Sequence, residues 1–227
     1  MESHNASAVI PSEARDLGEV APRLRRAVFL DRDGVICRNQ DDHVKSWEEF
    51  LFLPGVIKAL ARLARLDLDI VIITNQSIIN RLMVPVEVVE GIHARMVRAI
   101  EEAGGRIDRV MVCPHRPEDH CTCRKPQPGL LLAAAEESGL DLSHSYMIGD
   151  AESDMLAGQA AGCRPYLVLT GRGWRQLIRC WLHGLRDFAV VPDLGVAVNS
   201  IVRRENGRGQ HLNGGSVRRP ATAGGKR

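Results

Sequence analysis

The sequence predicts an α/β fold with a doubly wound, parallel β-sheet of the Rossmann-like type. Short apolar runs alternate with amphipathic helical segments over residues 26–203, as in a chain of β-α-β units. The apolar runs are continuous, which is typical of strands buried on both faces of a parallel sheet. Polar residues directly follow several of these runs, and open α/β sheets place their sites at the carboxyl ends of the strands.

Each element of this alternation has a local signal. Pro54-Gly55, Pro85 and Pro128 precede helical stripes, and Gly104 and Gly139 end two of them. We expect strands at 27–31, 69–77, 107–113, 145–150, 165–171 and 188–191, and helices at about 56–64, 85–103, 128–138, 153–161, 174–183 and 193–202. Residues 26–203 then form one domain, 1–25 a flexible arm, and 204–227 a disordered basic tail.

The composition favours an ordinary globular protein. The 227 residues are 44% hydrophobic and 26% charged, and the net charge is +2, so no strong attraction to nucleic acid is expected. No apolar run is long enough for a membrane span. The first residues carry acids and lack a signal-peptide pattern, so we expect a cytoplasmic protein.

The first apolar run leads into Asp31-Arg32-Asp33-Gly34. Side chains two apart in an extended segment share a face, so Asp31 and Asp33 can point into the same crevice. Two adjacent carboxylates repel unless a cation lies between them, and Mg²⁺ prefers such oxygen ligands. Taken alone, the same four residues also fit a surface turn.

The surrounding polar residues favour the first reading. Thr74 to Ser77 follow the second run, Asp150 follows the fourth, and Arg124-Lys125 leads into a helix. Carboxylates for a divalent cation, a hydroxyl, and basic side chains that bind phosphate oxygens would then meet at one edge of the sheet.

The order Asp-x-Asp, Thr, Lys, Gly-Asp-x-x-Ser-Asp resembles the haloacid dehalogenase superfamily of aspartyl-phosphate-forming phosphatases. The resemblance implies that Asp31 is the nucleophile and Asp33 the general acid and base. Thr74 and Lys125 would hold the phosphoryl group. Mg²⁺ would be bound by Asp31, the backbone carbonyl of Asp33, and Asp150.

Asp154 either braces this site or is a favourable acid at a helix N-terminus. The chain between the first strand and the first helix is too short for a large cap domain. Substrate choice should therefore depend on the loops 38–45, 77–84 and 113–125.

Three cysteines and one histidine lie within eleven residues. Cys113, His115, Cys121 and Cys123 are the Cys₃His set that structural Zn²⁺ takes. A disulfide or free thiols are the alternatives. A closed four-ligand site leaves no open position, so we expect a zinc-binding loop that stiffens the segment delivering Arg124 and Lys125.

The motifs FLDRDG, TNQS, CPH, CxCRKP and GD resemble, in this order, the D-glycero-D-manno-heptose 1,7-bisphosphate 7-phosphatase group and the related phosphatase half of bifunctional histidinol-phosphate enzymes. The resemblance implies a monomer with catalytic Mg²⁺, structural Zn²⁺ and a small phosphorylated sugar as substrate. The 7-phosphate of the heptose bisphosphate would be removed. Substrate contacts carry over to Arg32, Asn75, Gln76, Ser77 and Arg124.

Some positions depart from that group. Ile78 and Leu82 replace two glycines, His43 replaces a tyrosine, and Ala151 stands where a basic residue is frequent. These changes concern recognition, so another sugar or polyol phosphate, or histidinol phosphate, is an alternative substrate. A further alternative is a non-catalytic zinc module that binds nucleic acid through the basic tail.

Overall fold

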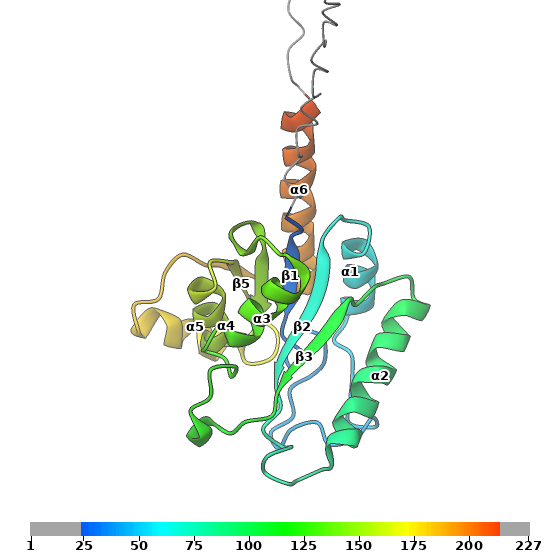
Figure 1. Cartoon of the computed structure of the whole chain (residues 1–227), viewed down its shortest axis with the longest axis vertical. Coiled ribbons are helices and arrows are strands. Elements are labelled where there is room, and N and C mark those ends of the chain that lie inside the picture. Colours follow the sequence, from blue (N-terminus) through cyan, green and yellow to red (C-terminus); the bar gives the residue numbers. More distant parts are fainter. Residues whose placement is uncertain (1–23, 214–227) are drawn as a thin grey trace, which may run out of the picture.

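The computed structural model describes residues 24–213 and contains a six-stranded sheet with helices on both faces (Figure 1). All neighbouring strands are parallel, in the order β3-β2-β1-β4-β5-β6. The fold prediction is confirmed. The strands are β1 (Ala27–Leu30), β2 (Asp69–Asn75), β3 (Arg109–Cys113), β4 (Tyr146–Gly149), β5 (Arg164–Val168) and β6 (Ala189–Val191).

Helices follow the strands in the expected alternation. They are α1 (Val56–Leu63), α2 (Val86–Glu102), α3 (Gly129–Ser138), α4 (Glu152–Ala160), α5 (Gly173–Leu182) and α6 (Leu194–Asn213), with 3₁₀ turns η1 (Pro117–Asp119) and η2 (Leu142–His144). Among the described residues the connection between β1 and α1 contains no further helix or strand element, in line with the expected absence of a large cap.

The sheet separates two hydrophobic clusters. Val28 and Leu30 of β1 pack in the cluster that includes α1, α2 and α6, whereas Ala27 and Phe29 face the cluster with α3 and α4. Alternate strand residues thus contact opposite layers, as the continuous apolar runs require. Figure 1 shows α1 and α2 on one side of the sheet and α3, α4 and α5 on the other.

The central strand β1 pairs with β2 on one side and β4 on the other. Strand order reverses between β1 and β4, because the chain moves outward from β1 through β2 and β3 and then returns to β4. Doubly wound sheets bind ligands beyond this switch point. Asp31 and Asp150 follow directly after the two strands that flank it.

The C-terminal boundary was predicted incorrectly. Helix α6 runs to Asn213, although a disordered tail was expected from residue 204 (Figure 1). Glu205 explains part of the difference, since it accepts a 2.6 Å hydrogen bond from the Tyr146 hydroxyl and forms an ion pair with Arg26. The expected arm, apart from residues 24 and 25, and the rest of the tail lie outside the described residues.

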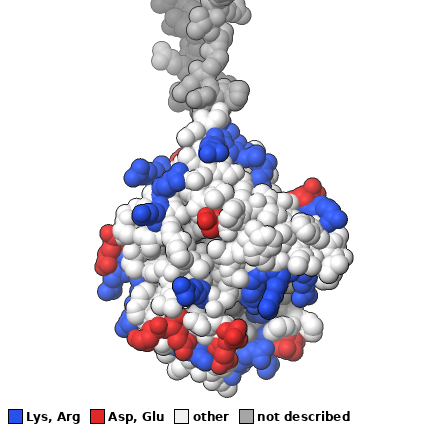
Figure 2. Space-filling model, turned by 180° about the vertical axis from the view of Figure 1, so that it is seen from behind, with Lys and Arg blue, Asp and Glu red and all other residues white. Residues whose placement is uncertain are grey.

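The charged surface is mixed. The face in Figure 2 carries both basic and acidic side chains. Of the helices that the model describes, none combines the length and the apolar character needed to cross a membrane.

Candidate active site

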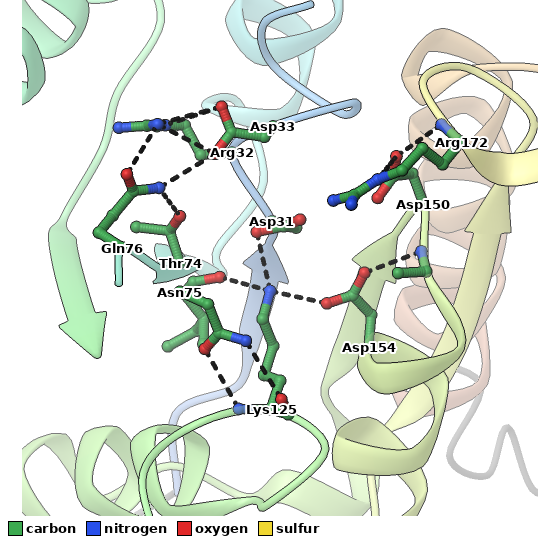
Figure 3. A network of polar contacts seen from close by, with 12 residues as sticks. Asp31, Arg32, Asp33, Thr74, Asn75, Gln76, Lys125, Asp150, Asp154 and Arg172 are labelled. Atoms are coloured by element: carbon green, nitrogen blue, oxygen red, sulfur yellow. Dashed lines mark hydrogen bonds and ion pairs between the residues drawn. The ribbon is translucent and has the colours of Figure 1, made fainter. Parts of the chain in front are cut away.

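A cavity of about 710 Å³ opens where the sequence places its polar residues, beyond the carboxyl ends of β1, β2 and β4. Asp31, Asp33, Thr74, Lys125 and Asp154 all line it. Asp150, which directly follows β4, is fully buried and close to Asp31 and Asp154. The structure therefore brings together every residue predicted to be catalytic and the carboxylates predicted to bind a metal (Figure 3).

Two glycines allow the chain to pass closely around Asp150. A Cβ atom at Gly34 would lie 2.1 Å from Asp150 Oδ2, and one at Gly171 would lie 2.3 Å from the same atom. Both glycines have positive φ, 86° and 58°. Only glycine meets both requirements without a clash or strain. The backbone at both glycines thus approaches the carboxylate of Asp150 closely.

The buried carboxylates fit a divalent cation. Asp31, Asp150 and Asp154 each offer an oxygen within 4.8 Å of the others. Asp150 Oδ2 accepts the Arg172 N–H at 2.8 Å, but its buried Oδ1 has no hydrogen-bond partner. A buried carboxylate oxygen without a partner is costly, and a metal ion would satisfy it.

Electrostatics support this fit. Burial raises the pKa of Asp31 to about 7, and the Asp154 and Asp150 carboxylates add to the rise while Lys125 opposes it. Burial, with the Asp154 charge, raises the pKa of Asp150 to about 6. Crowded carboxylates hold their protons more tightly until a cation compensates their charge. The donor set, all carboxylate oxygen, suits a hard cation such as Mg²⁺.

Lys125 connects two of these carboxylates. Its ammonium forms ion pairs with Asp31 Oδ1 at 2.8 Å and Asp154 Oδ1 at 2.6 Å, and it donates a hydrogen bond to the carbonyl of Ile73 at 2.8 Å (Figure 3). These contacts hold the ammonium group at the edge of the cavity. Asp154 also accepts the Ala151 N–H, which fixes it at the start of α4. Asp154 thus combines both interpretations of the sequence, since it pairs with Lys125 and lies at the N-terminus of α4, and it also contributes to the acidic group.

Asp33 points to a different set of partners. Its Oδ2 accepts from Arg32 Nη2 at 2.9 Å and from Gln76 Nε2 at 3.0 Å. The Arg32 charge and these hydrogen bonds keep the pKa of Asp33 below its usual value despite its burial. Gln76 Nε2 also donates to Thr74 Oγ1 at 2.8 Å. With an oxygen lone pair so occupied, the Thr74 hydroxyl keeps its proton for an acceptor in the cavity.

Arg32 and Gln76, predicted to contact substrate, do not line the cavity, and their role in substrate binding stays a prediction. The Arg32 guanidinium is completely buried. The partners of Arg32 are Asp33, Gln76 Oε1 and His93 Nε2. Both residues lie behind Asp33 and Thr74, so they hold side chains that line the cavity.

The remaining predicted substrate contacts do line the cavity. The side-chain amide of Asn75, however, forms hydrogen bonds with the backbone of Lys125. Its Nδ2 donates to the Lys125 carbonyl and its Oδ1 accepts the Lys125 N–H. Ser77 and Arg124 are better placed, and Arg124 Nη1 donates to the His115 carbonyl at 3.0 Å. Asn75 is therefore a support for Lys125 in this structure.

The predicted zinc ligands form a cluster beside this cavity. Cys123 Sγ lies 3.2 Å from Cys113 Sγ, 3.4 Å from Cys121 Sγ and 3.3 Å from His115 Nδ1. A tetrahedral zinc ion with bonds of about 2.0–2.3 Å separates its ligand atoms by about 3.5–3.8 Å. The cysteines are free thiols, so no disulfide competes. The four ligand atoms need to move by only a few tenths of an ångström to fit Zn²⁺.

Among the cavity residues that were not predicted as site residues, Arg172 and His43 stand out by their contacts. Arg172 follows β5 and holds Asp150 through its backbone N–H, and its Nε lies 4.0 Å from Asp150 Oδ2. The same rule that found the other residues, polar groups after a strand, applies to Thr170-Gly171-Arg172. His43 lines the cavity with a buried Nδ1 that has no hydrogen-bond partner. Its only sequence signal is its place in a predicted recognition loop.

The structure shows the backbone at two positions where the sequence departs from the group that it resembles. Leu82, at one of the two positions where the resemblance led us to expect glycine, has a φ of 55°. This left-handed conformation favours glycine, so the bulky residue adopts the backbone that a glycine allows. Ile78, at the other position, is fully buried.

The fold, with a carboxylate directly after the central strand and a lysine and two further carboxylates around it, defines a hydrolase of the haloacid dehalogenase type. A family model described as HAD-hydrolase-like matches residues 122–197. This match covers α3, β4, α4, β5 and α5, which carry Asp150 and Asp154, and begins just before Lys125.

Comparison with individual proteins narrows the class. A D-glycero-β-D-manno-heptose-1,7-bisphosphate 7-phosphatase of Pseudomonas aeruginosa is 42% identical over 153 residues, 67% of this chain and 86% of the relative. The Bordetella bronchiseptica protein of the same name is 41% identical over 172 residues, 74% of this chain and 96% of the relative. The chain belongs to the D-glycero-β-D-manno-heptose-1,7-bisphosphate 7-phosphatase family.

A solved structure agrees with this assignment. The D,D-heptose 1,7-bisphosphate phosphatase of B. bronchiseptica, crystallised with magnesium and phosphate, superposes with a TM-score of 0.75 at 37% identity. The superposition covers 79% of this chain and 99% of that one. The similarity therefore extends through the whole catalytic domain.

Proposed function

We propose that this protein is a Mg²⁺-dependent phosphomonoester hydrolase that removes the 7-phosphate of D-glycero-D-manno-heptose 1,7-bisphosphate, a step towards nucleotide-activated heptose. The observation that carries the chemistry is Asp31 at the switch point, 2.8 Å from Lys125 and beside the unpartnered Oδ1 of Asp150. The substrate rests on the names of the family's curated members.

The residues present suggest two chemical steps. An Asp31 carboxylate oxygen attacks phosphorus, the bond from phosphorus to the sugar oxygen breaks, and Asp33 gives its proton to that oxygen. Asp33 then takes a proton from water, which attacks the aspartyl phosphate and releases inorganic phosphate. The Arg32 charge and the hydrogen bonds that lower the pKa of Asp33 favour its ionised form, which the second step needs.

The other residues bind and orient. Thr74 and Lys125 donate to the phosphoryl oxygens, while Asn75 and Asp154 keep Lys125 in place. Mg²⁺ held by Asp31, Asp150 and the Asp33 carbonyl would offset the charge between nucleophile and phosphate. Ser77 and Arg124 are positioned to contact the rest of the substrate.

The zinc cluster has a structural part in this proposal. Cys113, His115, Cys121 and Cys123 supply four ligands and leave no coordination position for substrate. The cluster immediately precedes Arg124 and Lys125, so bound Zn²⁺ would stiffen the segment that delivers both. A monomeric state and a cytoplasmic location stay predictions.

A different small phosphomonoester is the second candidate substrate. His43 and Arg172 line the cavity and add an imidazole and a guanidinium group to the surface that would contact the substrate. Phosphate release from both anomers of the heptose bisphosphate should be compared with release from histidinol phosphate and simple sugar phosphates. A better kcat/KM for any of the latter would overturn the substrate assignment but not the reaction class.

The reaction class is tested by Asp31→Asn. We expect phosphate release from every substrate to disappear while the melting temperature and zinc content stay close to the parent's. Asp67→Asn, at an exposed aspartate outside the cavity, is the matched control and should leave turnover unchanged. Turnover retained by Asp31→Asn would refute the nucleophile assignment.

A further inference from the structure

The buried histidine of α2 is connected to the cavity by a continuous set of hydrogen bonds. Helix α2 buries Val89, Ile92, Met96 and Ile100 against the sheet, and His93 is the one titratable residue buried with them. It does not line the cavity. Its Nε2 lies 2.9 Å from Arg32 Nη1, 61 residues away in the sequence.

The chemistry of arginine fixes the state of this histidine. A guanidinium group only donates hydrogen bonds, so Nε2 of His93 must be the unprotonated, accepting nitrogen. The imidazole is then neutral, with its proton on Nδ1. Burial and the Arg32 charge lower the pKa of His93 to about 3, in agreement with the geometry.

Arg32 uses its other donors on the cavity side. Nη2 lies 2.9 Å from Asp33 Oδ2 and 3.0 Å from Gln76 Oε1, and Nε lies 3.3 Å from Asp33 Oδ1. Gln76 in turn donates to both Asp33 and Thr74. The orientation of the Arg32 guanidinium thus determines the orientation of the Asp33 carboxylate and, through Gln76, that of the Thr74 hydroxyl (Figure 3).

We propose that His93 is a positioning residue, which orients the buried Arg32 so that Asp33 and, through Gln76, Thr74 face the reacting phosphate correctly. Without an acceptor on α2, Nη1 of Arg32 would be a buried donor with no partner. The guanidinium would rotate towards the remaining acceptors, and the planar fork would no longer meet Asp33 and Gln76 together. The inference rests on the proposed function for its catalytic consequence, but the hydrogen bond itself does not.

The first test examines the histidine without any turnover. Nitrogen-detected NMR of the full chain should show His93 with a protonated Nδ1 and an unprotonated Nε2, unchanged from pH 8 down to pH 5. A histidine that becomes doubly protonated near its ordinary pKa of about 6.5 would overturn the proposal, whatever the enzyme's activity.

The second test separates positioning from packing. His93→Met keeps the bulk but removes the acceptor, and we expect kcat to fall about 10- to 100-fold, the effect typical of residues that orient reacting groups, with KM nearly unchanged. His93→Gln offers Oε1 as an acceptor and should recover most of the loss. Met96→Leu, fully buried on the same helix, is the packing control and should leave kcat unchanged.

The outcomes are distinct from those that test the reaction class. Retained turnover in Asp31→Asn would refute the mechanism but leave the NMR result standing. A normal kcat in His93→Met, or equal losses in His93→Met and His93→Gln, would overturn the positioning role. A loss of kcat that follows the melting temperature equally in His93→Met and Met96→Leu would do the same.

Discussion

Replacing Lys125 by methionine should destabilise the protein strongly and in a pH-dependent way. The ammonium is buried among three acceptors, two of them the carboxylates of Asp31 and Asp154. Methionine preserves most of the side-chain volume but donates no hydrogen bond. The variant therefore leaves two buried carboxylates with no cation between them.

The expected loss follows from this geometry. Removing one partner of a buried ion pair costs about 3–5 kcal/mol, because the other charge remains buried without compensation. The carboxyl groups can escape the penalty by taking up protons. Because the pKa of Asp31 is already raised to about 7 with the lysine present, it rises further in the variant.

The sign of the pH dependence is then fixed. A carboxyl group whose pKa is raised in the folded state binds protons that the unfolded chain releases above pH 4. Its contribution to stability is full below the unfolded pKa and is lost as the pH rises towards 7 and beyond. Lys125→Met should therefore be close to the parent's stability at pH 5 and much weaker at pH 8.

Urea unfolding of the metal-free protein at both pH values measures this difference. Lys58→Met, at an exposed lysine on α1, controls for the general effect of losing a positive charge and should change the free energy of unfolding by less than about 0.5 kcal/mol. A loss below about 1 kcal/mol for Lys125→Met at pH 8, or the same loss at both pH values, would refute the argument.

Three further outcomes are expected. Gly34→Ala should abolish most of the turnover and weaken Mg²⁺ binding in calorimetry, because a Cβ would lie 2.1 Å from Asp150 Oδ2; an alanine variant with normal Mg²⁺ affinity would contradict the role given to that glycine. Mg²⁺ should bind more weakly at pH 5 than at pH 8, because protons compete for Asp31 and Asp150, whose pKa values are about 7 and 6; equal affinity at both pH values would argue against these carboxylates as ligands. Cys123→Ser should lower zinc content and melting temperature together, and a chelator should cause a progressive loss of activity in the parent; instant, reversible inhibition would indicate a catalytic metal instead.

The sequence predicts the location of the site well, for a physical reason. Buried parallel strands are continuous apolar runs, so their ends are easy to recognise, and all carboxyl ends meet at one edge. Asp31, Thr74 and Asp150 were each found as the first polar residue after such a run. The cluster of Cys113, His115, Cys121 and Cys123 was found by a different signal, because its short spacing alone brings the four residues together.

The partners of individual side chains were harder to predict. Arg32 stands between two aspartates, which in the sequence suggests a cavity residue, yet its guanidinium is buried against His93. Nothing local to α2 reveals that its histidine will meet the end of β1. The extension of α6 has the same origin, since Glu205 is stabilised by Tyr146 and Arg26 from distant segments.

The segment Thr74-Asn75-Gln76 shows which side-chain contacts the sequence can predict and which it cannot. Residues two apart in a strand share a face, so Thr74 and Gln76 must point together and Asn75 away from them. The structure agrees, since Gln76 bonds to Thr74 and Asn75 bonds to the Lys125 backbone. Alternation thus predicts which side chains act together, but only the fold decides that one face meets Asp33 and the other meets Lys125. Within this motif Gln76 supports the acid–base residue on one face and Asn75 supports the lysine on the other, while Thr74 and Ser77 line the cavity.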